Sequence, residues 1–190
     1  INAEVNFAIE NPEFGTPTPY CKVYYSASFR QLSFLRGLLK QVLNLLSLDG
    51  SDRIRNLIDS SILQSLNSML TNRPVFGFTL LAYALNVVQT MINSEPTVFP
   101  ILVESETIKV IVENFESFIG PCSELLLVLP HVVSAICLNN DGLDMILKSD
   151  VVKTLFKPLT SLEMVKVLTV DDSDMEYGTE LDELYRHHPP

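Results

Sequence analysis

Three cysteines, Cys21, Cys122 and Cys137, are the side chains of this 190-residue sequence best suited to nucleophilic or redox chemistry. They form no CxxC pair and no spacing typical of metal ligands, and an odd, scattered set is typical of proteins in a reducing compartment. Only Cys21 has a basic neighbour in the sequence, Lys22, that could lower a thiol pKa. The sequence therefore predicts structural thiols in an intracellular protein.

The three histidines do not predict a metal site. His187 and His188 are adjacent, so on a helix their side chains diverge by about 100° and cannot share one metal ion. His131 follows Pro130 without an HExxH pattern or a cysteine at metal-ligand spacing. The seven glycines are isolated, which argues against a phosphate-binding loop. We therefore expect no catalytic residue, metal or cofactor in this chain.

Uncharged polar residues that recur every 45 positions are the remaining candidates for a site. The interval separates Gln41 from Asn86 and Asn86 from His131, and it recurs one helical turn later. The six residues are Gln41, Asn44, Asn86, Gln89, His131 and Ser134. On stacked helices they would form two rows along one face, here named the polar ladder, which could hydrogen-bond an extended partner. A solvated stripe or an internal ladder is the alternative interpretation.

The elements that must position this ladder are helices. Apolar residues recur at three- and four-residue spacing from Ser28 to about Val170, without the alternation typical of strands, which predicts an all-α fold. Long helices are expected near 29–47, 77–93 and 124–138, short ones near 52–59, 96–104 and 141–148, and following ones near 61–71, 107–119 and 150–157. Pro130 predicts a kink or a new start in the last long helix.

Three serines recur at nearly the same interval as the ladder residues. Ser60 and Ser105 are 45 residues apart, Ser105 and Ser149 are 44 residues apart, and each serine lies at a predicted break before a helix. This period is typical of armadillo and HEAT units, so we expect an α-solenoid of about three repeats, and an irregular helical domain is the alternative. The predicted segments are an irregular lead-in at 1–27, armadillo-like repeats within 28–170 (about 28–71, 75–119 and 122–160), an acidic loop at 171–177 and a C-terminal docking helix at 178–190.

Charge and composition exclude other classes. The formal net charge is −10, yet residues 171–183 hold seven acidic side chains and no basic one, and no helix carries a basic stripe, so direct nucleic-acid binding is not expected. Residues 74–94 carry no charge, but Asn86, Gln89 and Asn93 share one helical face, which favours a bundle helix over a membrane span. Because the chain begins with Ile, we interpret it as part of a longer protein.

Two strings of residues resemble a known family. The pattern LPxxxSAxCLNxxGL begins at Leu129, and ELxRHHP begins at Glu183. Together with matching segments over about residues 28–190, they resemble the armadillo-like region in the N-terminal half of the giant HECT-type ubiquitin ligases of the Tom/Huwe family.

The resemblance implies a parent protein that transfers ubiquitin from a cysteine in a C-terminal HECT domain to substrate lysines, in the nucleus and cytoplasm. This segment would be a non-catalytic scaffold that presents substrates and contacts neighbouring repeats, and none of its cysteines lies in the family's catalytic motif. A free-standing armadillo adaptor or transport factor is the alternative. Such factors hold basic peptides with Trp and Asn ladders, whereas this chain has no Trp and places Leu38, Tyr83 and Val128 at the matching positions.

Overall fold

Helices are the only regular elements in the residues that the computed structural model describes, namely 1–11, 27–47, 51–58, 60–120 and 122–161. The all-α prediction is therefore confirmed. The predicted acidic loop at 171–177 and docking helix at 178–190 lie outside the described residues.

Three long helices lie side by side in one layer. They are α2 (Phe29–Leu46), α5 (Arg73–Ser94) and α8 (Ser123–Cys137). Helix α5 packs against both of the others. All three lie where the apolar periodicity predicted them.

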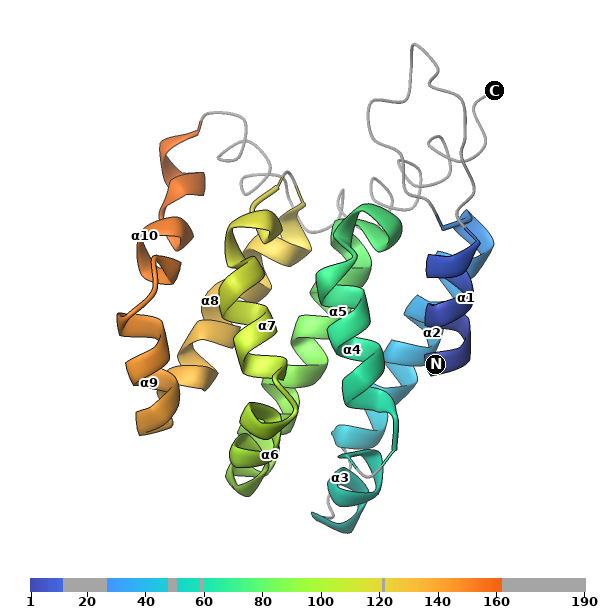
Figure 1. Cartoon of the computed structure of the whole chain (residues 1–190), viewed down its shortest axis with the longest axis horizontal. Helices are drawn as coiled ribbons and strands as arrows, with labels where there is room; N and C mark the ends of the chain where they lie inside the picture. Colours follow the sequence, from blue (N-terminus) through green and yellow to red (C-terminus); the bar gives the residue numbers. More distant parts are fainter. Residues whose placement is uncertain (12–26, 48–50, 59, 121, 162–190) are drawn as a thin grey trace.

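The second layer crosses the long helices (Figure 1). It contains α1 (Asn2–Glu10), α4 (Ile62–Thr71) and α7 (Thr107–Asn114), and the chain continues from α7 into the 3₁₀ helix η2 (Phe115–Phe118). Helix α4 packs against α1, α5 and α7, so the layer is continuous. Helix α10 (Val151–Leu155), followed by η3 (Lys157–Thr160), packs against η2 at one end of the molecule.

Short helices connect the two layers at the lower end in Figure 1. They are α3 (Ser51–Ile58), α6 (Phe99–Glu104), which follows the 3₁₀ helix η1 (Pro96–Val98), and α9 (Asn140–Leu147). The three predicted serine breaks all lie between a short helix and the helix that follows it.

The three serines make the same hydrogen bond. The Oγ atoms of Ser60, Ser105 and Ser149 each donate to the carbonyl oxygen three residues earlier, at the end of the short helix. In the first and last breaks, Oγ also accepts from the backbone N–H two residues later, at 3.3 and 3.4 Å. Each serine thus satisfies helix-terminal groups that have no partner inside a helix.

The long helices begin and continue in different ways. Ser28 and Gln31 form a capping box at the start of α2, where Ser28 Oγ accepts from the Gln31 N–H at 3.3 Å.

Helix α5 is interrupted at Gly77, whose φ of 74° and ψ of 177° are nearly exclusive to glycine. Helix α8 does not begin anew at Pro130, because it runs without a break from Ser123 to Cys137. Buried residues on both sides of Pro130, including Leu129 and Val132, offset the lost backbone hydrogen bond.

The lead-in predicted at 1–27, a short amphipathic opening followed by a loop, begins with a helix. Residues 2–10 form helix α1, and its Val5 and Ala8 are fully buried. Ser65 Oγ on α4 donates to Asn2 Oδ1 at 3.3 Å, which links the two helices. The burial of two small apolar side chains against α4 explains why this short segment is helical.

Helix α5 is the one helix among the described residues that is long and apolar enough to cross a membrane. Most of its apolar stretch, 67%, is buried inside the molecule. Burial against α2, α8 and α4 accounts for its composition, because a helix that is apolar on nearly all sides is typical of a protein core.

Candidate functional site

The accessible surface of α5 is a narrow polar stripe. From Leu80 to Gln89, every residue is buried except Tyr83, Asn86 and Gln89. Neighbouring helices cover the other sides, because α2 and α8 flank α5 and α4 packs against it as well. Two of the predicted ladder residues therefore occupy the stripe through which α5 reaches solvent.

The flanking long helices present the other ladder residues. Gln41 and Asn44 are exposed on α2, and His131 and Ser134 are exposed on α8. Within the described part of the chain, none of the six ladder side chains is hydrogen-bonded to another residue. The geometry thus leaves their donors and acceptors available to a partner, while their role in binding stays a prediction.

An aromatic ring and a cation lie beside the ladder. Lys40 Nζ of α2 lies 5.6 Å from the ring centroid of Tyr83 on α5, a cation–π contact that spans two long helices. Tyr83 is only partly buried, so its ring also offers an apolar surface to an incoming chain.

The charge of the long helices differs from that of the whole chain. Helices α2 and α5 contain the basic residues Arg30, Arg36, Lys40 and Arg73 and no acidic residue, whereas the chain as a whole carries −10. Two of the three helices that hold the ladder therefore carry only basic charges, whereas the third, α8, carries Glu124.

The described cysteines lack the environment of a nucleophile. Burial, together with the nearby Glu124 carboxylate, raises the pKa of the Cys122 thiol to about 12, and Cys122 Sγ donates to Glu124 Oε2 at 3.2 Å. Burial also raises the pKa of the Cys137 thiol. Both side chains are thus protonated at neutral pH, and the thiolate is the reactive form. Cys21 lies outside the described residues.

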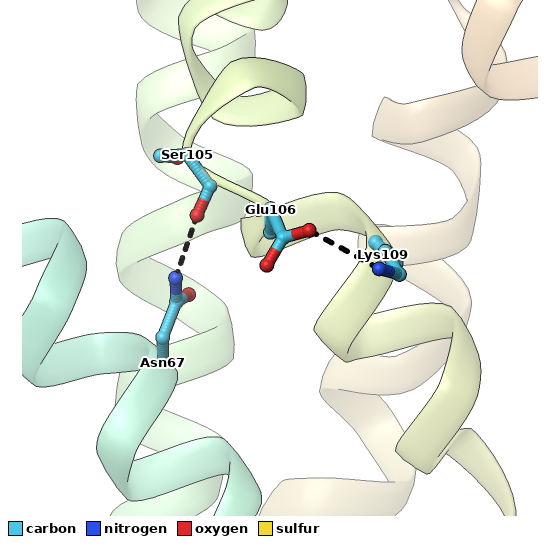
Figure 2. A network of polar contacts seen from close by, with 4 residues as sticks. All are labelled: Asn67, Ser105, Glu106 and Lys109. Carbon is cyan, nitrogen blue, oxygen red and sulfur yellow. Dashed lines mark hydrogen bonds and ion pairs between the residues drawn. The ribbon is translucent and has the colours of Figure 1, made fainter.

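One hydrogen bond between helices could not be predicted from the sequence. Asn67 Nδ2 on α4 donates to the Ser105 carbonyl oxygen at 2.9 Å, directly before α7 (Figure 2). The next residue, Glu106, has a φ of 61° and pairs with Lys109 at 3.1 Å. The position 45 residues after Asn67 is Val112, so no repeat pattern could have indicated this junction.

Comparison with known proteins places this arrangement in a family. The profile of a family described as "Domain of Unknown Function (DUF913)" matches residues 1–190, which is the whole sequence. The chain belongs to the DUF913 family.

Named relatives of this DUF913 domain are ubiquitin ligases. It is 54% identical over 189 residues to the "Probable E3 ubiquitin-protein ligase TOM1" of Eremothecium gossypii, covering 100% of this chain and 6% of that protein. It is 52% identical over 186 residues to the "E3 ubiquitin-protein ligase TOM1" of Saccharomyces cerevisiae, covering 98% of this chain and 6% of that protein. It is 30% identical over 166 residues to the mouse "E3 ubiquitin-protein ligase HUWE1", covering 80% of this chain and 4% of that protein.

The resemblance to the Tom/Huwe family is therefore confirmed over the full DUF913 domain. The domain spans about 6% of the length of the first two relatives.

Proposed function

We propose that this chain is a non-catalytic scaffold segment of a HECT-type E3 ubiquitin-protein ligase and that it presents protein substrates for ubiquitination. The observation that carries the proposal is the 54% identity, over the whole chain, to 6% of a protein named as an E3 ubiquitin ligase. The protonated state of Cys122 and Cys137 supports a non-catalytic role. A conjugating enzyme would act through a HECT domain elsewhere in the parent protein, in the nucleus and cytoplasm.

The scaffold would be an α-solenoid of armadillo-like repeats over about 28–71, 75–119 and 122–160. Burial at the 45-residue interval supports this organisation, because four sets of equivalent residues on α2, α5 and α8 are all buried. The sets are Leu35, Leu80 and Leu125; Leu39, Ala84 and Leu129; Val42, Val87 and Val132; and Leu46, Met91 and Ile136. Each of these four positions is thus a core position in all three proposed repeats.

The polar ladder would bind an extended segment of the substrate. Asn and Gln side chains each offer both donors and an acceptor, so they can pair with the backbone of a peptide of almost any sequence. The basic residues of α2 and α5 favour a neutral or acidic segment, and they disfavour the basic peptides that armadillo transport factors hold. Together with the absence of Trp, this charge supports the ligase scaffold over the transport factor. Neither nucleic acid nor a membrane is needed as a partner.

The first test concerns catalysis. When the purified chain is incubated with ubiquitin, ATP, and activating and conjugating enzymes, we expect no thioester adduct on a non-reducing gel, because the buried Cys122 and the partly buried Cys137 are protonated thiols. An isolated HECT domain provides the positive control. A reductant-sensitive adduct that disappears when one cysteine is replaced by Ala would contradict the non-catalytic role.

The second test concerns the ladder. Replacing Asn86 and Gln89 together by Ala removes two hydrogen-bonding side chains from its centre, each worth about 0.5–1.5 kcal/mol in binding. Proteins retained from a lysate on the immobilised chain should decrease roughly fivefold or more, while the free energy of unfolding changes by less than about 1 kcal/mol because both side chains are partly exposed. Quantitative mass spectrometry and urea denaturation measure the two effects.

Asn56→Ala is the matched control for the second test, since Asn56 is an exposed amide on α3, outside the three helices that carry the ladder. It should leave both retention and stability unchanged. Unchanged retention in the Asn86 and Gln89 double variant, with a large loss of stability, would instead indicate a structural ladder.

A further inference from the structure

Gly37 is a glycine that the fold does not require. It is exposed inside α2, and no heavy atom lies within 4 Å of the position that a Cβ would take. The other described glycines have structural reasons. Gly77 has a positive φ, and a Cβ at Gly120 or Gly142 would lie 2.2 or 2.3 Å from a neighbouring atom. Because glycine in a helix interior is less stable than alanine, stability alone favours a side chain at position 37.

The surface around this open position is polar and basic. Gly37 lies three residues before Lys40 and four before Gln41, so the three residues share one helical side, and all of them are exposed. Arg30, seven residues before Gly37, is exposed on the same side. Helix α2 contains no acidic residue, and no described acidic side chain forms an ion pair with Arg30 or Lys40. Both cations are thus available to an acidic group from outside.

An aromatic ring lies next to this surface on α5, which packs beside α2 (Figure 1). Lys40 Nζ lies 5.6 Å from the ring centroid of Tyr83, so the cation–π contact holds the ammonium group where the two helices meet. An ammonium group has three N–H donors, which leaves donors for a second partner. We name Gly37, Lys40, Gln41 and Tyr83 the Gly37 site.

We propose that the Gly37 site binds the carboxylate side chain of an Asp or Glu in an extended segment of a partner protein. The carboxylate would accept from Lys40 Nζ and Gln41 Nε2, and its methylene groups would pack on the Tyr83 ring. The segment's backbone would lie over Gly37, where any side chain would obstruct it. This inference rests on the proposed function, because it specifies the chemistry of the segment that the polar ladder holds.

Charge complementarity selects an acidic occupant. The acidic residue of the three long helices, Glu124 on α8, already accepts from Cys122 Sγ and Ser123 Oγ at 3.2 and 3.3 Å. A basic segment would place like charges beside Arg30 and Lys40, and a neutral segment would leave both cations without a partner. An acidic side chain is therefore the occupant that the charges of this surface favour.

Selection from a library of random peptides displayed on phage tests the chemistry of the occupant. We expect Asp and Glu to be enriched about threefold in the peptides that the immobilised full chain retains, because opposite charges attract across the interface. The Kd of the best acidic peptide is then measured by fluorescence anisotropy. This Kd should increase as NaCl is added, since salt screens pairs of exposed charges.

Substitutions in the Gly37 site separate binding from folding. Lys40→Gln should increase the Kd of the acidic peptide about fivefold, whereas Lys40→Arg keeps the charge and should retain most of the affinity. Gly37→Gln fills the open position with an uncharged side chain and should increase the Kd about tenfold. Its melting temperature should stay equal or rise, because Gln favours a helix more than Gly does. A purely structural role for Gly37 would not combine weaker binding with an equally stable fold.

Lys109→Gln is the matched control, because Lys109 is an exposed lysine on α7 in the second layer. It should leave the affinity unchanged. The inference is overturned if Asp and Glu are not enriched, or if the acidic peptides bind Gly37→Gln and Lys40→Gln as tightly as the original chain. Enrichment that appears only after the acidic residues of 171–183 are replaced by amides would also overturn it, because the chain's own acidic segment would then occupy the site.

The ladder variant distinguishes this inference from the proposed function. Peptides that require Asn86 and Gln89 but neither Gly37 nor Lys40 would overturn the Gly37 site and leave the polar ladder as a binding surface. Acidic peptides that require Gly37 and Lys40 but neither Asn86 nor Gln89 would support the Gly37 site and contradict the ladder.

Discussion

Replacing Gly142 by Ala is expected to destabilise the fold by about 1–3 kcal/mol or more, although both residues are compatible with a helix. A Cβ atom at this position in α9 would lie 2.3 Å from the Ile136 carbonyl oxygen and 2.7 Å from Phe99 Cζ. The carbonyl belongs to the backbone of α8 and cannot rotate away, so the two helices must separate. Because α9 also lies close to Phe99, the separation would expose apolar surface between α6 and α9 as well.

Gly37→Ala is the matched control for this substitution. Gly37 lies inside α2, and no atom would lie within 4 Å of the added Cβ. Here the substitution should increase stability by about 0.5–1 kcal/mol, because Ala loses less conformational entropy than Gly when a helix forms. Urea denaturation of both variants measures the contrast, and an equal gain in stability for both would refute the close contact at Gly142.

Stability at alkaline pH should depend strongly on Cys122. The folded protein holds this thiol protonated up to a pKa of about 12, whereas the unfolded chain ionises it near its ordinary value of 9. The unfolded state therefore binds fewer protons as the pH rises above 9, and the free energy of unfolding falls by about 1.4 kcal/mol per pH unit from this group. The stabilisation is fully present below pH 9 and is lost progressively toward pH 12.

Comparison with Cys122→Ala isolates this effect from the titration of tyrosines and lysines. Between pH 9 and 10.5, the unfolding free energy of the original chain should fall by about 2 kcal/mol more than that of the variant. Cys137→Ala serves as the control, because Cys137 is only partly buried and should contribute a smaller difference. Parallel pH profiles for the original chain and Cys122→Ala would show that the Cys122 thiol is not held protonated by the fold.

The helices were largely determined by local sequence. Apolar residues at three- and four-residue spacing placed α2, α5 and α8 close to their observed bounds, because a helix buries one side whatever it packs against. The serine breaks at Ser60, Ser105 and Ser149 were also predictable, since their hydrogen bonds join residues only two or three positions apart. The family, too, could be identified from two short strings of residues.

Contacts between distant residues were decided only by the tertiary structure. The close approach of Gly142 to α8, the hydrogen bond from Asn67 to Ser105 and the packing of α1 on α4 depend on how helices meet, and helical periodicity contains no information about the partner of a given side. The same is true of exposure. Leu159 and Phe115 are both apolar residues of short 3₁₀ helices, yet Leu159 is exposed and Phe115 is buried, because burial depends on the elements packed around a residue and not on the residue itself.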